Sequence, residues 1–338
     1  MPVTITAGVT FSGGGLTMSF APPTVATAGW FAGGTAPAVS PNDGTGFVSK
    51  VSRITFATDT TTGVFRGPLT IGRRFFAGSG NMTYGWFAAG NTYGGPSTSS
   101  VDRTTYSTDT ATMSTRGPLT AEKYSAVAAG TNDYGWYMGG SPGATQVLRI
   151  DYGNDTATAS SRGPLAGNKY YSQTGVSDNT TYGWVASGRY TYSNVQRITY
   201  ANDTATSSVR GPLTTNNLER MAGVNTTSYG WFGGGYNSTP SAPFPARVTT
   251  VQRIDYANDT ATSSVRGPLS LARELGTNGA NSDTYGWFGG GYNGIPGAGA
   301  VYYSTVDRIT FATDTTTASG RGPLSMDPRT NAATSGLQ

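Results

Sequence analysis

The sequence predicts an all-β fold, a six-bladed β-propeller whose blades are four-stranded antiparallel sheets. Three observations support this prediction. The eleven-residue sequence DTATSSVRGPL occurs twice without change and four more times in looser form, and each copy belongs to a unit of 46 to 56 residues. Gly, Ser, Thr and aromatic residues are abundant, whereas only 12% of residues are charged. Units of about 50 residues that hold four short strands are typical of propeller blades.

Each unit contains a segment of fixed length. A Val begins it, an Arg follows two positions later, an Asp comes eight residues after the Val, and RGPL begins seven residues after the Asp. No copy gains or loses a residue, so we expect two paired strands joined by a turn of fixed geometry. The six repeated pairs are Arg53 and Asp59, Arg103 and Asp109, Arg149 and Asp155, Arg197 and Asp203, Arg253 and Asp259, and Arg308 and Asp314.

The fourth unit shows how the strands are assigned. Its VQRITYA segment is rich in β-branched and aromatic residues and predicts the third strand, after which Asn202 and Asp203 supply a turn. TATSSVR predicts the fourth strand, which ends before Pro212 because proline cannot donate to the ladder. The upstream YGW segment, which ends in small residues, predicts the second strand. The next Trp follows RGPL by 17 to 19 residues, which leaves room for the innermost strand.

The two ends of the chain predict how the ring closes. Pro22 and Pro23 disfavour an innermost strand before Trp30, whereas the last 14 residues, SMDPRTNAATSGLQ, align with the innermost strand of other units. We therefore expect a propeller over residues 23–338 whose first blade takes its innermost strand from the C-terminus. Residues 1–22 lie outside the repeat and predict two short strands around SGGG. An isolated hairpin is marginally stable, so we expect an assembly arm that docks on a neighbouring protein, with the propeller's own rim as the alternative.

The repeated residues are expected to be structural. An Arg buried between blades requires a counter-charge, and the repeated Asp is the natural partner. Calcium binding at the Asp turns is the alternative, but each turn offers one carboxylate where calcium takes six to eight oxygens. The six Trp residues recur at one position in every unit, which favours packing over ligand stacking.

The copies differ most between the second and third strands. The spacing from Trp to the following Val is 21, 15, 11, 11, 20 and 19 residues, so the long loops belong to blades five, six and one, which are neighbours in a ring. Tyr and Asn with Ser and Gly suit adaptable recognition surfaces; packing of these loops on the disc is the alternative. The predicted binding residues are Tyr236, Asn237, Phe244, Tyr292, Asn293, Tyr302, Tyr303, Tyr190, Tyr192 and Tyr93.

Composition excludes several kinds of chemistry. The chain has no Cys and no His, which removes thiol and imidazole catalysis and the usual zinc sites, and we expect no cofactor and no metal. The net charge is +4, but twelve repeated Arg and six repeated Asp account for it and the rest of the chain sums to −2, so we expect no nucleic acid partner. No stretch is long and apolar enough for membrane insertion, and no secretory signal is evident.

Catalysis is not expected. Glu122, Glu219 and Glu274 follow RGPL segments, and a pair of them could flank a sugar bond as in glycosidases. Their sequence surroundings predict ordinary solvated turns, and NDTAT lacks the Asp box of sialidases. We therefore expect a binding or structural protein.

Two resemblances extend this interpretation. The order of strands, with a hydrophobic strand ending in Gly-Gly, resembles kelch-type propellers over roughly residues 25–338, although the Trp precedes the diglycine here. YGWFGGG, VDRITFATDTTT and ARELGTNGANSDTYGW resemble repeat proteins of marine tailed bacteriophages, notably those of cyanobacteria, as does the VTITAGVTFSGGGLTM start. This resemblance implies a virion structural protein on a tail fibre or capsid surface, assembled in the host cytoplasm and joined to other virion proteins through its arm. A host-surface glycan or receptor would be its partner, with decoration of the particle as one alternative and a secreted or cell-surface lectin-like kelch module as another. The disc edges and the arm would also permit a homo-oligomer.

Overall fold

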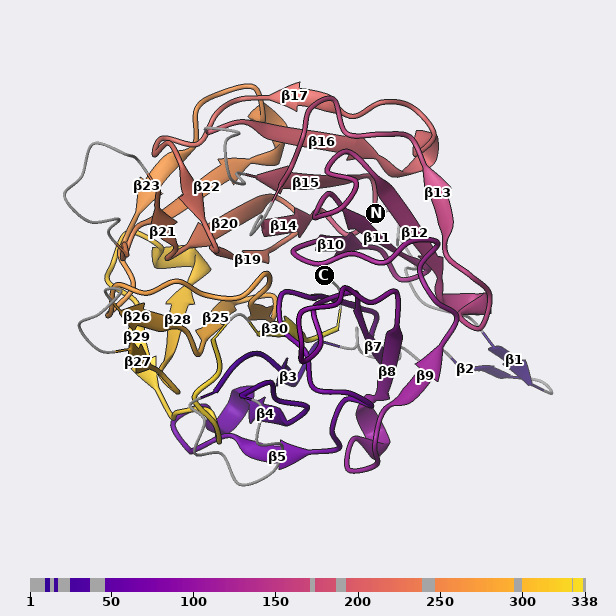
Figure 1. Cartoon of the computed structure of the whole chain (residues 1–338), viewed down its shortest axis with the longest axis horizontal. Coiled ribbons are helices and arrows are strands. Elements are labelled where there is room, and N and C mark those ends of the chain that lie inside the picture. The colour runs from indigo at the N-terminus through magenta and orange to yellow at the C-terminus, as the bar shows by residue number, and fades with distance from the viewer. Residues whose placement is uncertain are drawn as a thin grey trace.

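The computed structural model of the protein describes residues 10–12, 15–17, 25–36, 46–170, 174–186, 193–238, 247–294, 300–329 and 331–336. Six four-stranded antiparallel sheets surround a common axis, which confirms the six-bladed propeller (Figure 1). In the described ranges no helix is long and apolar enough to cross a membrane.

Every blade has the same strand order from the axis outward. Blade one contains β30 (Ala332–Thr334), β3 (Ala28–Ala32), β4 (Val51–Thr55) and β5 (Val64–Arg66). Blade two contains β6 (Ala77–Gly80), β7 (Tyr84–Ala88), β8 (Val101–Thr105) and β9 (Ser114–Arg116). Blade three contains β10 (Val127–Gly130), β11 (Tyr134–Met138), β12 (Val147–Asp151) and β13 (Ser160–Arg162).

The remaining three blades repeat this order. Blade four contains β14 (Thr174–Ser177), β15 (Tyr182–Ala186), β16 (Val195–Thr199) and β17 (Ser208–Arg210). Blade five contains β19 (Ala222–Asn225), β20 (Tyr229–Gly233), β22 (Val251–Asp255) and β23 (Ser264–Arg266). Blade six contains β24 (Ala280–Asn281), β25 (Tyr285–Gly289), β28 (Val306–Thr310) and β29 (Ser319–Arg321).

The C-terminus closes the ring as the sequence predicted. Strand β30 pairs antiparallel with β3, with Ala333 opposite Phe31, and so becomes the innermost strand of blade one. At the other end of the chain, β1 (Thr10–Ser12) and β2 (Gly15–Thr17) form the expected hairpin, with Phe11 opposite Leu16. Figure 1 shows this hairpin outside the ring of blades. Its role as an assembly arm stays a prediction.

The fourth strand is shorter than the sequence suggested. In blade four it begins only at Ser208, because Tyr200–Asn202 form a 3-10 turn that continues through Asp203 into a further turn. The same 3-10 turn recurs in every blade. It directs the carboxylate of the repeated Asp away from its own blade and toward the preceding one.

Each seam between blades is built around that Asp. The Asp203 carboxylate accepts hydrogen bonds from the indole Nε1 of Trp136 at 2.8 Å and from Nη1 of Arg149 at 3.0 Å, and Arg162 of the RGPL segment lies within 3.4 Å. The Trp136 ring also stacks on Tyr200, with centroids 4.0 Å apart. The other five inter-blade carboxylates, each with two Arg and one Trp of the preceding blade, are Asp59, Asp109, Asp155, Asp259 and Asp314. Their oxygens are thereby engaged by guanidinium and indole groups.

The disc has two faces with different contents. The turn face bears the 3-10 turns and the turns between innermost and second strands, at residues 81–83, 131–133, 178–181, 226–228 and 282–284. The loop face bears the loops after each second strand and the segments after each RGPL, because antiparallel strands alternate direction. Blades five, six and one are neighbours in the ring (Figure 1), so their long loops leave adjacent parts of the loop face.

Candidate functional site

The candidate site begins where two second strands end on the loop face. After β20 and β25 the chain passes through diglycine turns with positive φ, 67° and 111° at Gly234 and Gly235, a conformation that favours glycine. In blade five the chain then forms β21 (Tyr236–Asn237), paired with β18 (Leu218–Glu219). In blade six it forms a hairpin of β26 (Tyr292–Gly294) and β27 (Ala300–Tyr302).

A buried carboxylate organises the charges beside these strands. Glu274 has no exposed surface, and its backbone pairs with that of Tyr292. Its Oε1 lies 3.2 Å from Nη2 of Arg247 and 3.2 Å from Nη2 of Arg329, while Oε2 accepts from Nη1 of Arg220. Three guanidinium groups from different parts of the ring therefore converge on one carboxylate.

Tyrosine rings cover these guanidinium groups. Arg247 lies over both Tyr236 and Tyr292, at 5.0 and 5.3 Å from the ring centroids, and Arg329 lies 3.9 Å from the centroid of Tyr292. The Tyr292 ring also meets Tyr302 edge to face at 5.3 Å. Cations over aromatic faces are attracted to the ring quadrupole, so the tyrosines hold the arginines in place as well as lining the surface.

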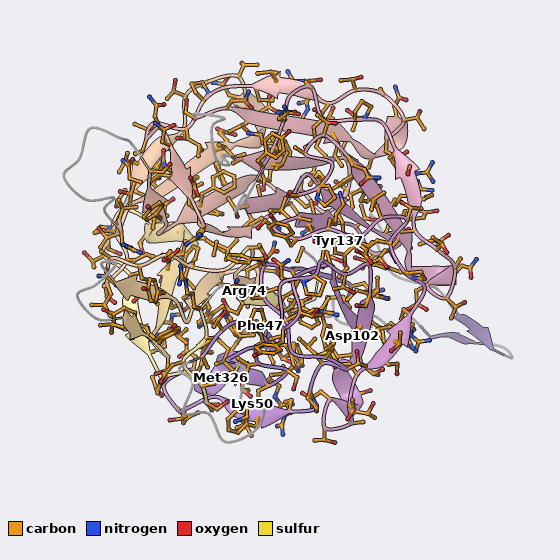
Figure 2. The ribbon with its side chains drawn as sticks, viewed as in Figure 1. Phe47, Lys50, Arg74, Asp102, Tyr137 and Met326 are labelled. Carbon is orange, nitrogen blue, oxygen red and sulfur yellow. The ribbon has the colours of Figure 1, made fainter. Side chains whose placement is uncertain are left out.

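A fourth arginine joins the cluster from blade two. Burial and the positive charges of Arg329 and Arg220 lower the pKa of Arg74. Its guanidinium lies over Phe47 at 4.8 Å and over Phe75 at 5.0 Å. Figure 2 shows Arg74 and Phe47 together, closer to the middle of the disc than Lys50. We call Arg74, Arg220, Arg247, Arg329 and Glu274 the axial arginine cluster.

The predicted binding residues divide into three groups. Tyr236, Tyr292 and Tyr302 contact the axial arginine cluster or one another, and Asn237, Asn293 and Tyr303 are half-buried beside them. Tyr93 is separate: it is 66% exposed and packs edge to face on Phe47 at 6.3 Å. Phe244, Tyr190 and Tyr192 lie outside the described residues.

The expected surroundings of the glutamates were wrong for two of the three. Glu122 is exposed, but Glu219 and Glu274 are buried rather than placed in solvated turns. The reason is the ring itself, which brings arginines that are distant in sequence over Glu274. Within the described residues, no group of three or more acidic side chains could hold a metal ion.

The arginines themselves were missed, although the sequence contained a signal. In each blade an inward segment runs from RGPL to the innermost strand, and one of its residues pairs with the residue that follows the glycine after the second strand. Arg74, Glu274 and Arg329 occupy this equivalent position in blades two, six and one, where they pair with Asn91, Tyr292 and Thr35 in that order. Tyr124 and Glu219 fill the same position in blades three and five. The position is thus shared, but its charge differs from blade to blade.

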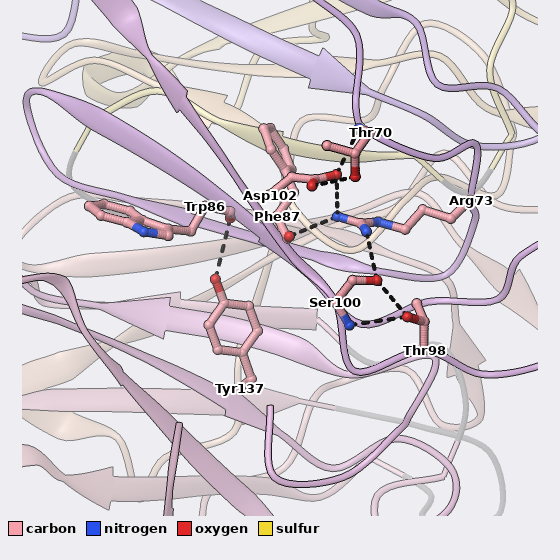
Figure 3. A network of polar contacts seen from close by, with 8 residues as sticks. All are labelled: Thr70, Arg73, Trp86, Phe87, Thr98, Ser100, Asp102 and Tyr137. Carbon is pink, nitrogen blue, oxygen red and sulfur yellow. Dashed lines mark hydrogen bonds and ion pairs between the residues drawn. The ribbon is translucent and has the colours of Figure 1, made fainter. Parts of the chain in front are cut away.

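Below the loop face lies a second layer of buried cations. Arg73 has no exposed surface; its Nη2 lies 3.2 Å from Asp102 and donates to the Phe87 carbonyl at 2.8 Å, while Thr70 donates to Asp102 (Figure 3). Arg273 pairs in the same way with Asp307 at 2.8 Å. Blade four has Lys169 instead, whose ammonium donates to the Asn194 carbonyl at 2.6 Å, and burial lowers its pKa to about 7. These groups are enclosed, so we assign them to the scaffold.

Comparisons with known proteins agree with the fold and identify no family. No family model matches the chain, and no curated protein matches it by sequence. Many solved structures match; one is the structure of YjhT, with a TM-score of 0.59 and 11% identity over 81% of this chain and 91% of that one. At this identity the likeness concerns the fold alone. The chain is therefore a six-bladed β-propeller protein.

Proposed function

We propose that this chain is a recognition protein of a bacteriophage virion, displayed on a tail fibre or the capsid surface, which binds a host-surface ligand through its loop face. The observation that carries the proposal is the contrast between identical seams and one divergent cluster. All six seams use the same Asp, Arg and Trp contacts, whereas the axial arginine cluster and its tyrosines occupy positions whose side chains differ from blade to blade. Binding residues typically lie on variable loops that a rigid scaffold holds in position.

The position of the chain ends supports display of this face. Val25 and Ala26 line a pocket of about 260 Å³ together with Asn132, Asn179 and Ser282, which belong to the turns of the turn face. The N-terminal arm therefore departs from the side of the disc opposite the axial arginine cluster. Attachment to other virion proteins through this arm would leave the loop face directed outward.

The proposal is one of binding without catalysis. Glu274 is enclosed and held by three arginines, and Glu219 is buried, so neither is free to serve as an acid or base near a ligand. Glu122 is exposed but belongs to blade three, whereas Tyr236, Tyr292 and Tyr302 belong to blades five and six.

Two measurements test the proposal. Mass spectrometry of purified particles should find this chain at a stoichiometric copy number; its presence only in host extracts would favour the secreted lectin-like alternative. A glycan array should give a signal that is lost when Tyr236, Tyr292 and Tyr303 are changed to Ala. Phe65→Ala serves as the control, because Phe65 is 49% exposed on the outermost strand of blade one. An equal signal from the tyrosine variant and the control would contradict the proposal that the loop face binds the ligand.

A further inference from the structure

The axial arginine cluster holds more positive charge than its carboxylates neutralise. Three guanidinium groups contact the single carboxylate of Glu274, and that of Arg74 lies near two of them. Counting the neighbouring buried Glu219 as well, four arginines and two glutamates leave an excess of two positive charges among the described residues. Arginine stays protonated at any pH a protein encounters. The excess must therefore be balanced by solvent ions or by a ligand.

Arg74 is the member of the cluster that is not paired. Within the described part of the chain no carboxylate lies within ion-pair distance of its guanidinium, in contrast to the layer below, where Arg73 pairs with Asp102 and Arg273 with Asp307. Among the described residues the Arg74 guanidinium therefore has no counter-charge of its own. The side chain is held between Phe47 and Phe75 and remains partly exposed, so its planar fork is oriented before any ligand arrives.

We propose that the axial arginine cluster binds a carboxylate or sulfate group of an acidic saccharide, with Arg74 as the principal anion-binding residue. This inference rests on the proposed recognition function and names its ligand class. Arg74 would pair with the anionic group through its fork, and Arg220 and Arg329 would add a favourable field from the side of Glu274.

The surroundings favour a sugar over other anions. Tyr292 and Tyr302 meet edge to face, and Tyr302 lies close enough to Arg74 to raise the pKa of Arg74 slightly against the lowering by burial. Tyrosine combines a flat apolar ring with a hydroxyl, and so can contact both the face and the hydroxyl groups of a sugar. A nucleic acid would require a row of cations along its backbone, whereas this cluster is compact and centred on the axis.

Calorimetric titration of the full chain at low salt tests the inference. The probes are tetragalacturonate for the carboxylate, a sulfated galactan tetrasaccharide for the sulfate, neutral maltotetraose, and a 15-nucleotide single-stranded oligo-dT. Arg74→Gln removes the fork and its charge, and Arg74→Lys keeps the charge alone. Lys50→Gln is the matched control, because it removes one positive charge from the same face while Lys50 lies over Phe65, outside the cluster.

We expect at least one acidic tetrasaccharide to bind and maltotetraose not to bind. Arg74→Gln should weaken the binding by about tenfold or more, as loss of a hydrogen-bonded charged group does, and Arg74→Lys should fall between. Lys50→Gln should stay within about twofold, because Lys50 lies over Phe65 and outside the axial arginine cluster. Thermal melts identify any variant that fails to fold, in which case Arg74→Lys decides the comparison.

Three results would overturn the inference: no binding of either acidic saccharide, equal effects of Arg74→Gln and Lys50→Gln, or tighter binding of oligo-dT than of both saccharides. The inference and the proposed function fail separately. A chain that is found in virions and binds host cells without these saccharides leaves the proposed function standing. A chain that binds acidic saccharide but is absent from virions leaves only the anion site.

Discussion

Asp59 of the first blade and Trp287 of the last lie 228 residues apart in sequence and are joined by a 2.8 Å hydrogen bond from the indole Nε1 to the carboxylate. Arg308 of the last blade contacts the same Asp59 oxygen at 3.0 Å. The distances are those of the Asp203 seam inside the chain. The seam that closes the ring therefore has the same contacts as the five internal seams.

Equivalence of the seams predicts equal costs of breaking them. Asp59→Asn and Asp203→Asn each leave two largely buried arginines without a carboxylate. Each substitution should lower the free energy of unfolding by about 3 kcal/mol. This value is at the lower end of the range for broken buried ion pairs, because the arginines keep some contact with solvent. Chemical denaturation measures both variants. Asp133→Asn, which removes an exposed charge from blade three, should have little effect. A much smaller loss in Asp59→Asn than in Asp203→Asn would mean that the ring opens at the closing seam.

The close packing of the RGPL glycine against the next blade allows a second test of the same seam, a steric one. A Cβ on Gly322 would lie 2.0 Å from the Thr61 carbonyl oxygen of the next blade, and the Gly322 N–H donates to the Asp59 carbonyl at 2.8 Å. Gly322→Ala should therefore destabilise the protein by about 3 kcal/mol through overpacking. The matched control is Gly320→Ala, two residues earlier, where an added Cβ meets nothing within 4 Å. A similar melting temperature in both variants would show that the seam tolerates displacement.

The sequence predicted the scaffold well for a physical reason. Six seams with one set of contacts require the same segment in every unit, so the counterparts of Arg149, Asp155 and Arg162 recur at fixed spacing, and ring closure follows from the missing innermost strand. The binding surface has no such redundancy. Glu274 was expected in solvent because its sequence surroundings predict an ordinary turn after RGPL, whereas in the structure Arg247 of the neighbouring blade and Arg329 of the C-terminal segment lie over it.

Blade one departs from the repeat in a way that can be repaired. In the other blades a Tyr precedes the seam Trp by two residues and covers the seam Arg, as Tyr134 covers Arg149 at 4.3 Å. Blade one has Ala28 there, and a pocket of about 480 Å³ opens beside Ala28, Trp30 and Met82. Correspondingly the Arg53 side chain is 27% exposed, against 18–21% for its five counterparts.

Ala28→Tyr should therefore stabilise the protein. The new ring would meet Trp30 edge to face and lie under Arg53, contacts that contribute about 0.5–1.5 kcal/mol. A rise in the denaturation midpoint without a change in its slope would show this. Ala28→Leu is the control, because it fills the pocket without a ring; an equal gain from leucine would assign the effect to buried area alone.

The enclosed ammonium of Lys169 predicts a dependence of stability on pH. Burial lowers its pKa to about 7 in the folded chain, whereas an unfolded lysine titrates near 10.4. Between these values the unfolded state binds a proton that the folded state does not, so the free energy of unfolding should rise with pH, by up to about 1.4 kcal/mol per pH unit. Lys169→Met removes this contribution. Denaturation at pH 7, 8 and 9 should therefore show a wild-type stability that increases relative to that of Lys169→Met, while Lys50→Met follows the wild type. Parallel pH profiles of wild type and Lys169→Met would mean that Lys169 remains charged when folded, with water reaching it through the loop face.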